Sequence, residues 1–283
     1  MGEGPFGDIY FDRIDSRDFG LPKSAILKLE LAQLRIDELR IRQIRFVAEG
    51  HLEATRQLVE PDADGRSRIH QVLWSRREPV PAIIGLLVGE VAHSIRCALD
   101  HLAFALAQAG AALSGVTLSP DHERNVQFPV CDSDAQFWKA ARRRLPFVED
   151  RLIEWIRCRQ PYNAMKVIPN QHPLSIVSRL DNVDKHRRIN VVSDALVMFR
   201  DNWDSGLPEW RWTPATTPEN AAIGQYEFDF PVSAEHTALA FDYGLFIDGI
   251  PRQGGKSWEV LQNCLAVTRG MVMAPLTAPY SSM

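Results

Sequence analysis

Residues 84–106 read IGLLVGEVAHSIRCALDHLAFAL, the most regular stretch of the chain. Its apolar residues recur at intervals of three and four, the period of one face of an α-helix. They are Ile84, Val88, Val91, Ile95, Leu99, Leu102 and Leu106. We therefore expect a long helix that buries this face in a core. The small residues that begin at Gly110 predict the end of the helix and a loop to about Ser133.

Upstream of this helix, the sequence predicts one more long helix and two short strands. Residues 24–59 contain no Pro, have Gly only at position 50, and are rich in Ala, Leu, Glu and Arg, which indicates a helix. The Pro-Asp-Ala-Asp-Gly of residues 61–65 should end it. Residues 8–13 and 69–75 have the composition and alternation of strands.

Downstream, the pattern changes from helical to strand-like at about residue 190. Helices are expected at 135–144, 148–159 and 173–188, and a last one at 257–268. Strands are expected at 191–199, 209–212, 225–232 and 237–247. The predicted fold class is α+β, a bundle of four to five helices with a smaller C-terminal antiparallel β portion. The predicted division is an N-terminal arm or strand (1–21), the helical bundle (22–190) and a β-rich portion with a final helix (191–283) that packs on the bundle as one unit.

Composition excludes several classes of protein. The 283 residues are 45% hydrophobic and 24% charged, which argues against collagen-like, low-complexity and wholly disordered chains. The four cysteines lie far apart, which argues against a zinc ribbon and fits a reducing cytoplasm. The N-terminus lacks the basic and apolar segments of a signal peptide, and the longest uncharged run, residues 102–120, continues an amphipathic helix. We expect a cytoplasmic protein that does not span a membrane.

Charge is unevenly distributed, although the net charge is only −4. Residues 137–191 contain twelve cations and five acids, and nine of those cations are arginines. Such a segment favours an anionic partner. Lys185, Arg187 and Arg188 are candidate phosphate-binding residues, and their place near a helix C-terminus would also stabilise the helix dipole.

The polar face of the helix at 84–106 is unusual for a solvated surface. Glu90, His93, Cys97 and Asp100 follow one another at spacings of three, four and three, and so share this face. If other helices cover these groups, each needs a partner. Glu90 and His93 also have the Glu-x-x-His spacing of ferritin-like metal sites, but the sequence has no second copy. We therefore predict no metal and no cofactor, with a metal-binding helical-bundle enzyme as an alternative.

Four phrases resemble a family of uncharacterised bacterial proteins. They are G-E-x-x-H-x-I-R-x-x-L-D-H-L at 89–102, Phe-Pro-Val at 128–130, Gln-Pro-Tyr at 160–162 and Asp-Lys-His-Arg at 184–187. More loosely, Arg96-x4-His101 is similar to the R-x4-6-H motif of HEPN domains, all-α modules of which many are metal-independent ribonucleases of toxin, CRISPR and phage-defence systems. The resemblance implies a HEPN-like bundle, an RNA partner, a homodimer, and catalytic roles for Arg96 and His101.

Two main interpretations follow. In the first, the protein binds RNA or cleaves it as an endoribonuclease of a toxin or phage-defence system. His101 would then move protons and Arg96 would stabilise the phosphate. The supporting residues would be Glu90, His93, Asp100, Asp184 and His186. In the second, the protein is not catalytic, and its Arg, His and Asp residues form a structural polar core. The two differ in whether Arg96, His101 and His186 converge on an open cleft or lie buried and bonded to one another.

Overall fold

The computed structural model describes residues 23–49, 52–58, 69–76, 79–186, 191–201, 224–227, 237–250 and 255–277. The chain forms two compact units. The helical unit comprises Met1–Ile36, Leu87–Arg188 and Val260–Met283, and the sheet unit comprises Asp37–Leu86 and Ile189–Glu259. The strands predicted at 8–13 and 209–212, and the N-terminal arm at 1–21, lie outside the described residues.

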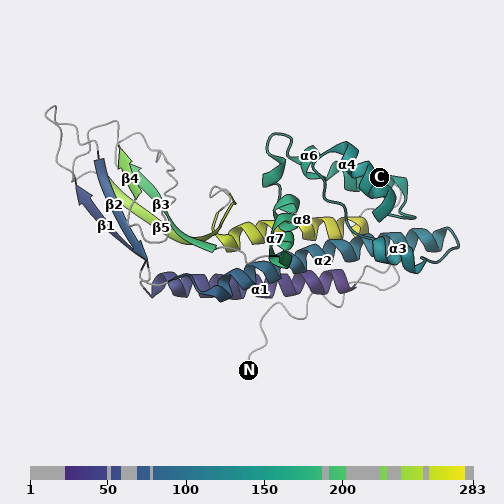
Figure 1. The fold of residues 1–283 in the computed structure, drawn as a ribbon, viewed down its shortest axis with the longest axis horizontal. Helices are drawn as coiled ribbons and strands as arrows, with labels where there is room; N and C mark the ends of the chain where they lie inside the picture. The colour runs from purple at the N-terminus through teal and green to yellow at the C-terminus, as the bar shows by residue number, and fades with distance from the viewer. Residues whose placement is uncertain are drawn as a thin grey trace, which may run out of the picture. The chain divides into compact units, whose positions relative to one another are not determined.

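Four helices build the centre of the helical unit. They are α1 (Lys23–Ala48), α2 (Ala82–Leu113), α7 (Pro173–His186) and α8 (Ser257–Thr277). Figure 1 shows α1, α2 and α8 running side by side. The predicted class is α+β with a bundle of four to five helices, and of this the coarser statement, that the described part of the chain is mostly helical, is confirmed.

Polar contacts tie these helices together within the helical unit. Gln33 of α1 and Gln262 of α8 exchange hydrogen bonds of 2.9 and 3.1 Å between their amide groups. The Cys264 thiol of α8 donates to the carbonyl of Pro173, at the start of α7, over 3.6 Å. Segments far apart in the sequence therefore share one core.

The apolar face of α2 lies in that core as predicted. Ile84, Val88, Val91, Ile95, Leu99 and Leu102 are at most 2% exposed, and Leu106 is half-buried. Within the described residues, α2 is also the one helix long and apolar enough to cross a membrane, and 67% of its most apolar window is buried inside the protein. A core helix of a soluble protein has the same properties.

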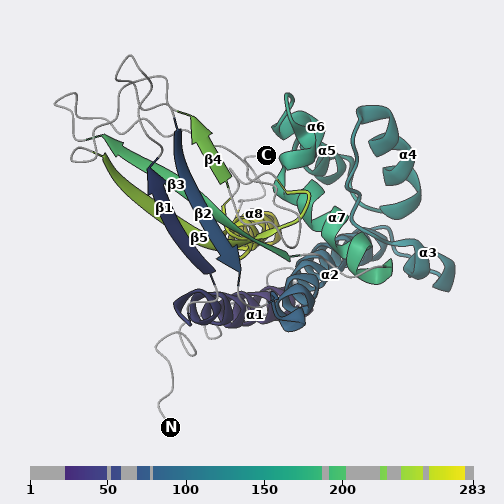
Figure 2. The same cartoon turned by 60° about the vertical axis from the view of Figure 1, so that its left-hand side comes forward.

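Shorter helices occupy the segment between α2 and α7. They are α3 (Pro120–Asn125), α4 (Asp134–Arg144), α5 (Asp150–Cys158), α6 (Pro161–Ala164) and a 3-10 turn at Pro169–Gln171. Figure 2 shows α4, α5 and α6 near α7, and α3 near the C-terminal end of α2. The helix α3 corrects the predicted loop to Ser133. Its N-terminus has Pro120 in the first turn and Ser119 as a cap, which accepts a hydrogen bond from the backbone N–H of His122.

Strands form two antiparallel sheets in the sheet unit. The first has the order β1 (Leu52–Leu58), β2 (Ile69–Arg76) and β4 (Gly224–Glu227). The second pairs β3 (Val191–Asp201) with β5 (Thr237–Ile247). Two of the three strands in the first sheet precede α2 in the chain, so the strands are not limited to the C-terminal portion.

Three predicted helix boundaries were wrong. The helix expected over 24–59 ends at Ala48, because residues 52–58 pair with β2 instead of continuing the helix. Cross-strand pairing outweighs the modest helix propensity of this segment. The helix α2 continues through Gly110 to Leu113, and α8 extends to Thr277, nine residues beyond the predicted end.

Candidate functional site

A histidine of α2 and an aspartate of α7 form the centre of the candidate site. His93 Nδ1 lies 2.8 Å from Asp181 Oδ1. The Asp181 side chain is 4% exposed, whereas the His93 side chain is 51% exposed. Because an ionised carboxylate only accepts hydrogen bonds, this geometry suits donation from an Nδ1–H of His93 to Asp181. This dyad thus joins a solvent-accessible imidazole to a buried carboxylate that fixes its orientation.

Cys97 completes a chain of three polar side chains. Its Sγ lies 3.4 Å from His93 Nε2, one helical turn away on α2. Burial raises the pKa of Cys97 above the usual value for a thiol, and the carboxylates of Asp100 and Asp181 add to this effect, while Lys28 and Lys185 oppose it. The neutral thiol is therefore favoured, which argues against Cys97 as a thiolate nucleophile.

Lys185 brings a positive charge to the dyad. Its Nζ lies 2.5 Å from Asp181 Oδ2, one turn along α7, and its side chain is 47% exposed. The Asp181 carboxylate thus accepts from both His93 and Lys185. Lys185 is one of the three phosphate-binding residues predicted from the sequence, and the other two, Arg187 and Arg188, lie outside the described residues.

The helices α2 and α7 approach closely beside the dyad. A Cβ atom placed on Gly89 would lie 2.1 Å from Asp184 Oδ1, so the absence of a side chain at Gly89 admits the Asp184 carboxylate. Glu90, the next residue, forms an ion pair of 3.0 Å with Arg35 of α1. Of the predicted supporting residues, the structure therefore brings Asp184 against α2 and directs Glu90 toward α1.

Arg96 is bonded to internal partners. Its side chain is 7% exposed, and its Nη2 donates to Asp100 Oδ1 over 3.0 Å and to the carbonyl of Phe128 over 2.6 Å. Asp100 Oδ1 also accepts from the backbone N–H of Phe128 over 2.9 Å. Together, Arg96, Asp100 and the Phe128 backbone form a clamp, which we call the Arg96 clamp, that holds the segment after α3 against α2.

The Arg96 clamp includes two of the groups that act on the pKa of Asp100. Burial raises the pKa of Asp100 above its usual value, whereas the Arg96 guanidinium and the Phe128 N–H lower it. The guanidinium is thus the main group that keeps this partly buried carboxylate charged. Such an arrangement is typical of a structural ion pair.

The predicted convergence of Arg96, His101 and His186 is only partly described. His101 is half-buried, and its Nδ1 is buried without a hydrogen-bond partner among the described residues. No hydrogen bond or ion pair joins it to Arg96 in that part of the chain. His186 is the last residue of α7, and its side chain lies outside the description.

The structure also bears on metal binding. Where the chain is described, no group of three or more His, Cys, Asp or Glu side chains has an arrangement that could hold a metal ion. The site as described therefore consists of the dyad, Cys97, Lys185 and the close contact at Gly89.

The sequence did not reveal Asp181 as the partner of His93. The available signal was the position of a carboxylate on the apolar face of α7, where Leu174, Val177 and Leu180 are at most 3% exposed. Asp181 itself is 3% exposed, and an ionised group so deeply buried requires a partner. The Phe128 backbone could not have been found in this way, since any residue provides the same carbonyl and N–H.

Thiol reactivity offers a direct check of this geometry. We expect Cys158, which is exposed, to react first with iodoacetamide at pH 8. Cys97 and Cys131 should react more slowly, because burial raises the pKa of each thiol and so lowers its thiolate fraction. Cys264 should react last, since burial raises its pKa to about 12. Mass spectrometry of a time course gives the order, and labelling of Cys97 before Cys158 would contradict the described environment.

Comparisons of the chain with protein-family models, with curated proteins and with solved structures find no match.

Proposed function

We propose that the protein binds and cleaves RNA without a metal ion, and that the His93–Asp181 dyad performs the proton transfer. The observation that carries the proposal is the dyad itself, a half-exposed imidazole held at 2.8 Å by a carboxylate that is almost fully buried. Histidine is the commonest general base in enzymes, and the one described partner of His93 Nε2 is the Cys97 thiol, a weak donor that a substrate hydroxyl would displace. The basic segment at 137–191, in which Lys185 lies beside the dyad, supports an anionic polymer as substrate.

The proposed reaction is an internal transesterification. His93 Nε2 takes the proton of a ribose 2′-hydroxyl, and the 2′-oxygen forms a bond to the adjacent phosphorus. The bond from phosphorus to the 5′-oxygen breaks, that oxygen leaves with a proton from water, and the hydroxide so formed takes the proton back from His93. The products are a 2′,3′-cyclic phosphate and a 5′-hydroxyl. Lys185 would stabilise the charge that develops on the phosphate.

This proposal moves the catalytic role from Arg96 and His101 to His93. The Arg96 guanidinium already bonds two internal acceptors, so it has less capacity to hold a phosphate. The HEPN-like bundle, the homodimer and the cytoplasmic location stay predictions that rest on the sequence and on its resemblance.

The Arg96 clamp favours a second candidate, in which the polar residues of α2 serve only to stabilise the fold. A buried guanidinium bonded to a carboxylate and a carbonyl is sufficient for that role. The two candidates differ at His93, whose half-exposed ring is well placed for catalysis, whereas the buried Asp181 carboxylate keeps Lys185 as a partner if His93 is lost.

Replacement of His93 tests the proposed function. We expect His93→Ala to reduce the rate of cleavage of a labelled single-stranded RNA by at least about 100-fold, the usual contribution of a general base. Gel electrophoresis would measure the rate, and the wild-type products should carry 2′,3′-cyclic phosphate ends in the presence of EDTA. Lys185 still pairs with the buried Asp181 carboxylate in this variant, so the protein should stay folded, which a thermal melt checks.

His122→Ala is the matched control. His122 is an exposed histidine on α3 whose ring contacts Phe147, and it is not part of the dyad. Its loss should leave the cleavage rate unchanged. Absence of cleavage by the wild-type protein, or full activity in His93→Ala, would refute the proposed function and favour the structural candidate.

A further inference from the structure

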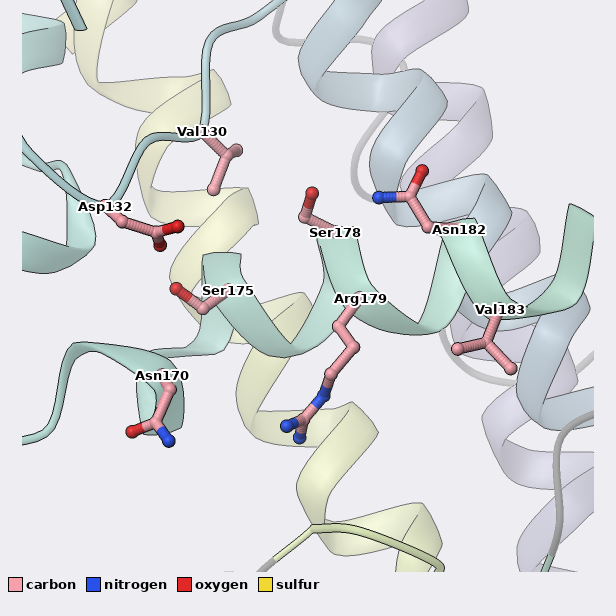
Figure 3. A pocket seen from close by; sticks show the side chains of 8 residues that line it. All are labelled: Val130, Asp132, Asn170, Ser175, Ser178, Arg179, Asn182 and Val183. Atoms are coloured by element: carbon pink, nitrogen blue, oxygen red, sulfur yellow. The ribbon is translucent and has the colours of Figure 1, made fainter. Parts of the chain in front are cut away.

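A pocket of about 620 Å³ lies beside α7, on a different face of the helix from Asp181. Five of its lining residues come from α7, and the rest come from the segment before α4 and from the 3-10 turn. Figure 3 shows Ser178 and Asn182 extending from one side of the helix and Arg179 from the other. A volume of this size is typical of sites for small molecules.

Arg179 supplies the positive charge of the pocket. It is exposed, and no hydrogen bond or ion pair engages it within the described ranges. An unengaged guanidinium has a planar set of five donors that fits a phosphate or a carboxylate. In Figure 3 it extends to the side of the pocket on which Asn170 lies. An anionic group of a ligand would therefore be placed between Arg179 and Asn170.

The other polar residues of the pocket fit a ligand that has neutral hydrogen-bonding groups as well as a negative charge. Asp132 adds a carboxylate, which balances the charge of Arg179 and accepts hydrogen bonds from a ligand. Asn170 and Asn182 each present an amide donor and an amide acceptor, the pair of groups that recognises the edge of a nucleobase. The ligand should therefore combine an anionic group with neutral donors and acceptors.

Ser175 indicates that a polar ligand atom is needed. Its Oγ is buried without a hydrogen-bond partner in the described structure, and it lines the pocket. A buried hydroxyl is normally hydrogen-bonded, and a change of the Ser175 rotamer would let this one bond a ligand oxygen in the pocket. Val130 and Val183 add apolar surface against which a base or a sugar can pack.

We propose that this pocket binds a nucleoside monophosphate, either free or as one residue of single-stranded RNA. Arg179 and Asn170 bind the phosphate, Asn182 contacts the base edge, and Asp132 accepts from an amino or hydroxyl group of the nucleotide. The RNA source rests on the proposed function, whereas the free nucleotide does not.

Calorimetric titration of the full chain tests this proposal. The probes are the four nucleoside 5′-monophosphates, the corresponding nucleosides, inorganic phosphate and a five-residue single-stranded RNA. We expect at least one monophosphate to bind at a ratio of one to one, more tightly than its nucleoside or phosphate alone. Tighter binding of the RNA than of any monophosphate would identify RNA as the source, and equal or weaker binding would identify the free nucleotide.

Three variants locate the binding. Arg179→Ala should weaken nucleotide binding by at least about tenfold, as loss of a charged hydrogen-bond donor usually does. Asn182→Ala should weaken it and alter the preference among bases. Arg143→Ala, which removes an exposed cation from α4, should leave binding unchanged. A thermal melt of each variant confirms that it is folded.

Two results would overturn the pocket proposal. One is that no monophosphate binds more tightly than inorganic phosphate, and the other is that Arg179→Ala binds as the wild type does. Cleavage of RNA by a protein that fails these tests would leave the proposed function standing. Nucleotide binding by a protein that cleaves no RNA would support the pocket and refute the proposed function.

Discussion

Arg96→Ala should lower the free energy of unfolding by about 3 kcal/mol or more, the usual effect of breaking a buried ion pair. The guanidinium is 7% exposed and bonds both Asp100 and the Phe128 carbonyl. Its removal leaves a partly buried carboxylate without its cation and a buried carbonyl without its donor. Urea unfolding followed by circular dichroism measures the change.

The destabilisation should depend on pH. Burial already raises the pKa of Asp100, and Arg96 is the largest influence that lowers it. Without Arg96 the pKa of Asp100 in the folded state rises further, so the folded protein holds a proton that the unfolded chain has released. Stability of the variant then falls as pH rises through this pKa, and the loss relative to the wild type should be smaller near pH 4 than at pH 7.

Two comparisons make the result decisive. Arg96→Lys keeps the positive charge but lacks the planar guanidinium that donates to both Asp100 and the Phe128 carbonyl. Its free energy of unfolding should lie between those of the wild type and Arg96→Ala. Arg143→Ala, on an exposed face of α4, should change stability by less than about 0.5 kcal/mol. If Arg96→Ala instead left stability unchanged while abolishing RNA cleavage, the catalytic role implied by the sequence resemblance would be correct.

Gly110→Ala should produce the second large effect, a loss of about 2 kcal/mol or more, because it forces extra volume into a packed site. A Cβ atom on Gly110 would lie 1.7 Å from the carbonyl oxygen of Phe147. The obstacle is backbone, and Phe147 already has a positive φ of 61°, so this segment has little freedom to move away. Thermal denaturation gives the change in midpoint.

Gly270→Ala is the matched control for that substitution. Gly270 lies inside α8, and among the described residues no atom outside its own stretch of helix lies within 4 Å of the position that its Cβ would occupy. Alanine is the better helix former, so this variant should gain about 0.5–1 kcal/mol. Equal effects of the two substitutions would contradict the close contact between α2 and Phe147.

The features that the sequence predicted well depend on helical periodicity. The spacing of the apolar residues correctly indicated which face of α2 is buried, because residues three and four apart lie on one side of a helix. The same geometry correctly grouped His93, Cys97 and Asp100 on one face of α2. Local spacing is sufficient for such statements, since neighbours three and four residues apart are fixed by the helix itself.

The features that the sequence did not predict depend on contacts between distant segments. The strand β1 exists because it pairs with β2, and this pairing outweighs a local preference for helix. Asp181 meets His93 because α7 packs on α2, although 88 residues separate them. Besides Asp100, Arg96 bonds the backbone carbonyl of Phe128, and every residue has such a carbonyl, so the sequence could not indicate this partner.

The hydrogen bonds between Gln33 and Gln262 span 229 residues of chain. Contacts over such a separation require closure of a long loop and slow the formation of a native core. On the ribosome, α1 is made long before α8, whose Leu261 and Leu265 are buried in the helical unit. The part of the helical core that α8 completes therefore stays exposed until α8 emerges, and a chaperone that binds apolar helices could act during that interval.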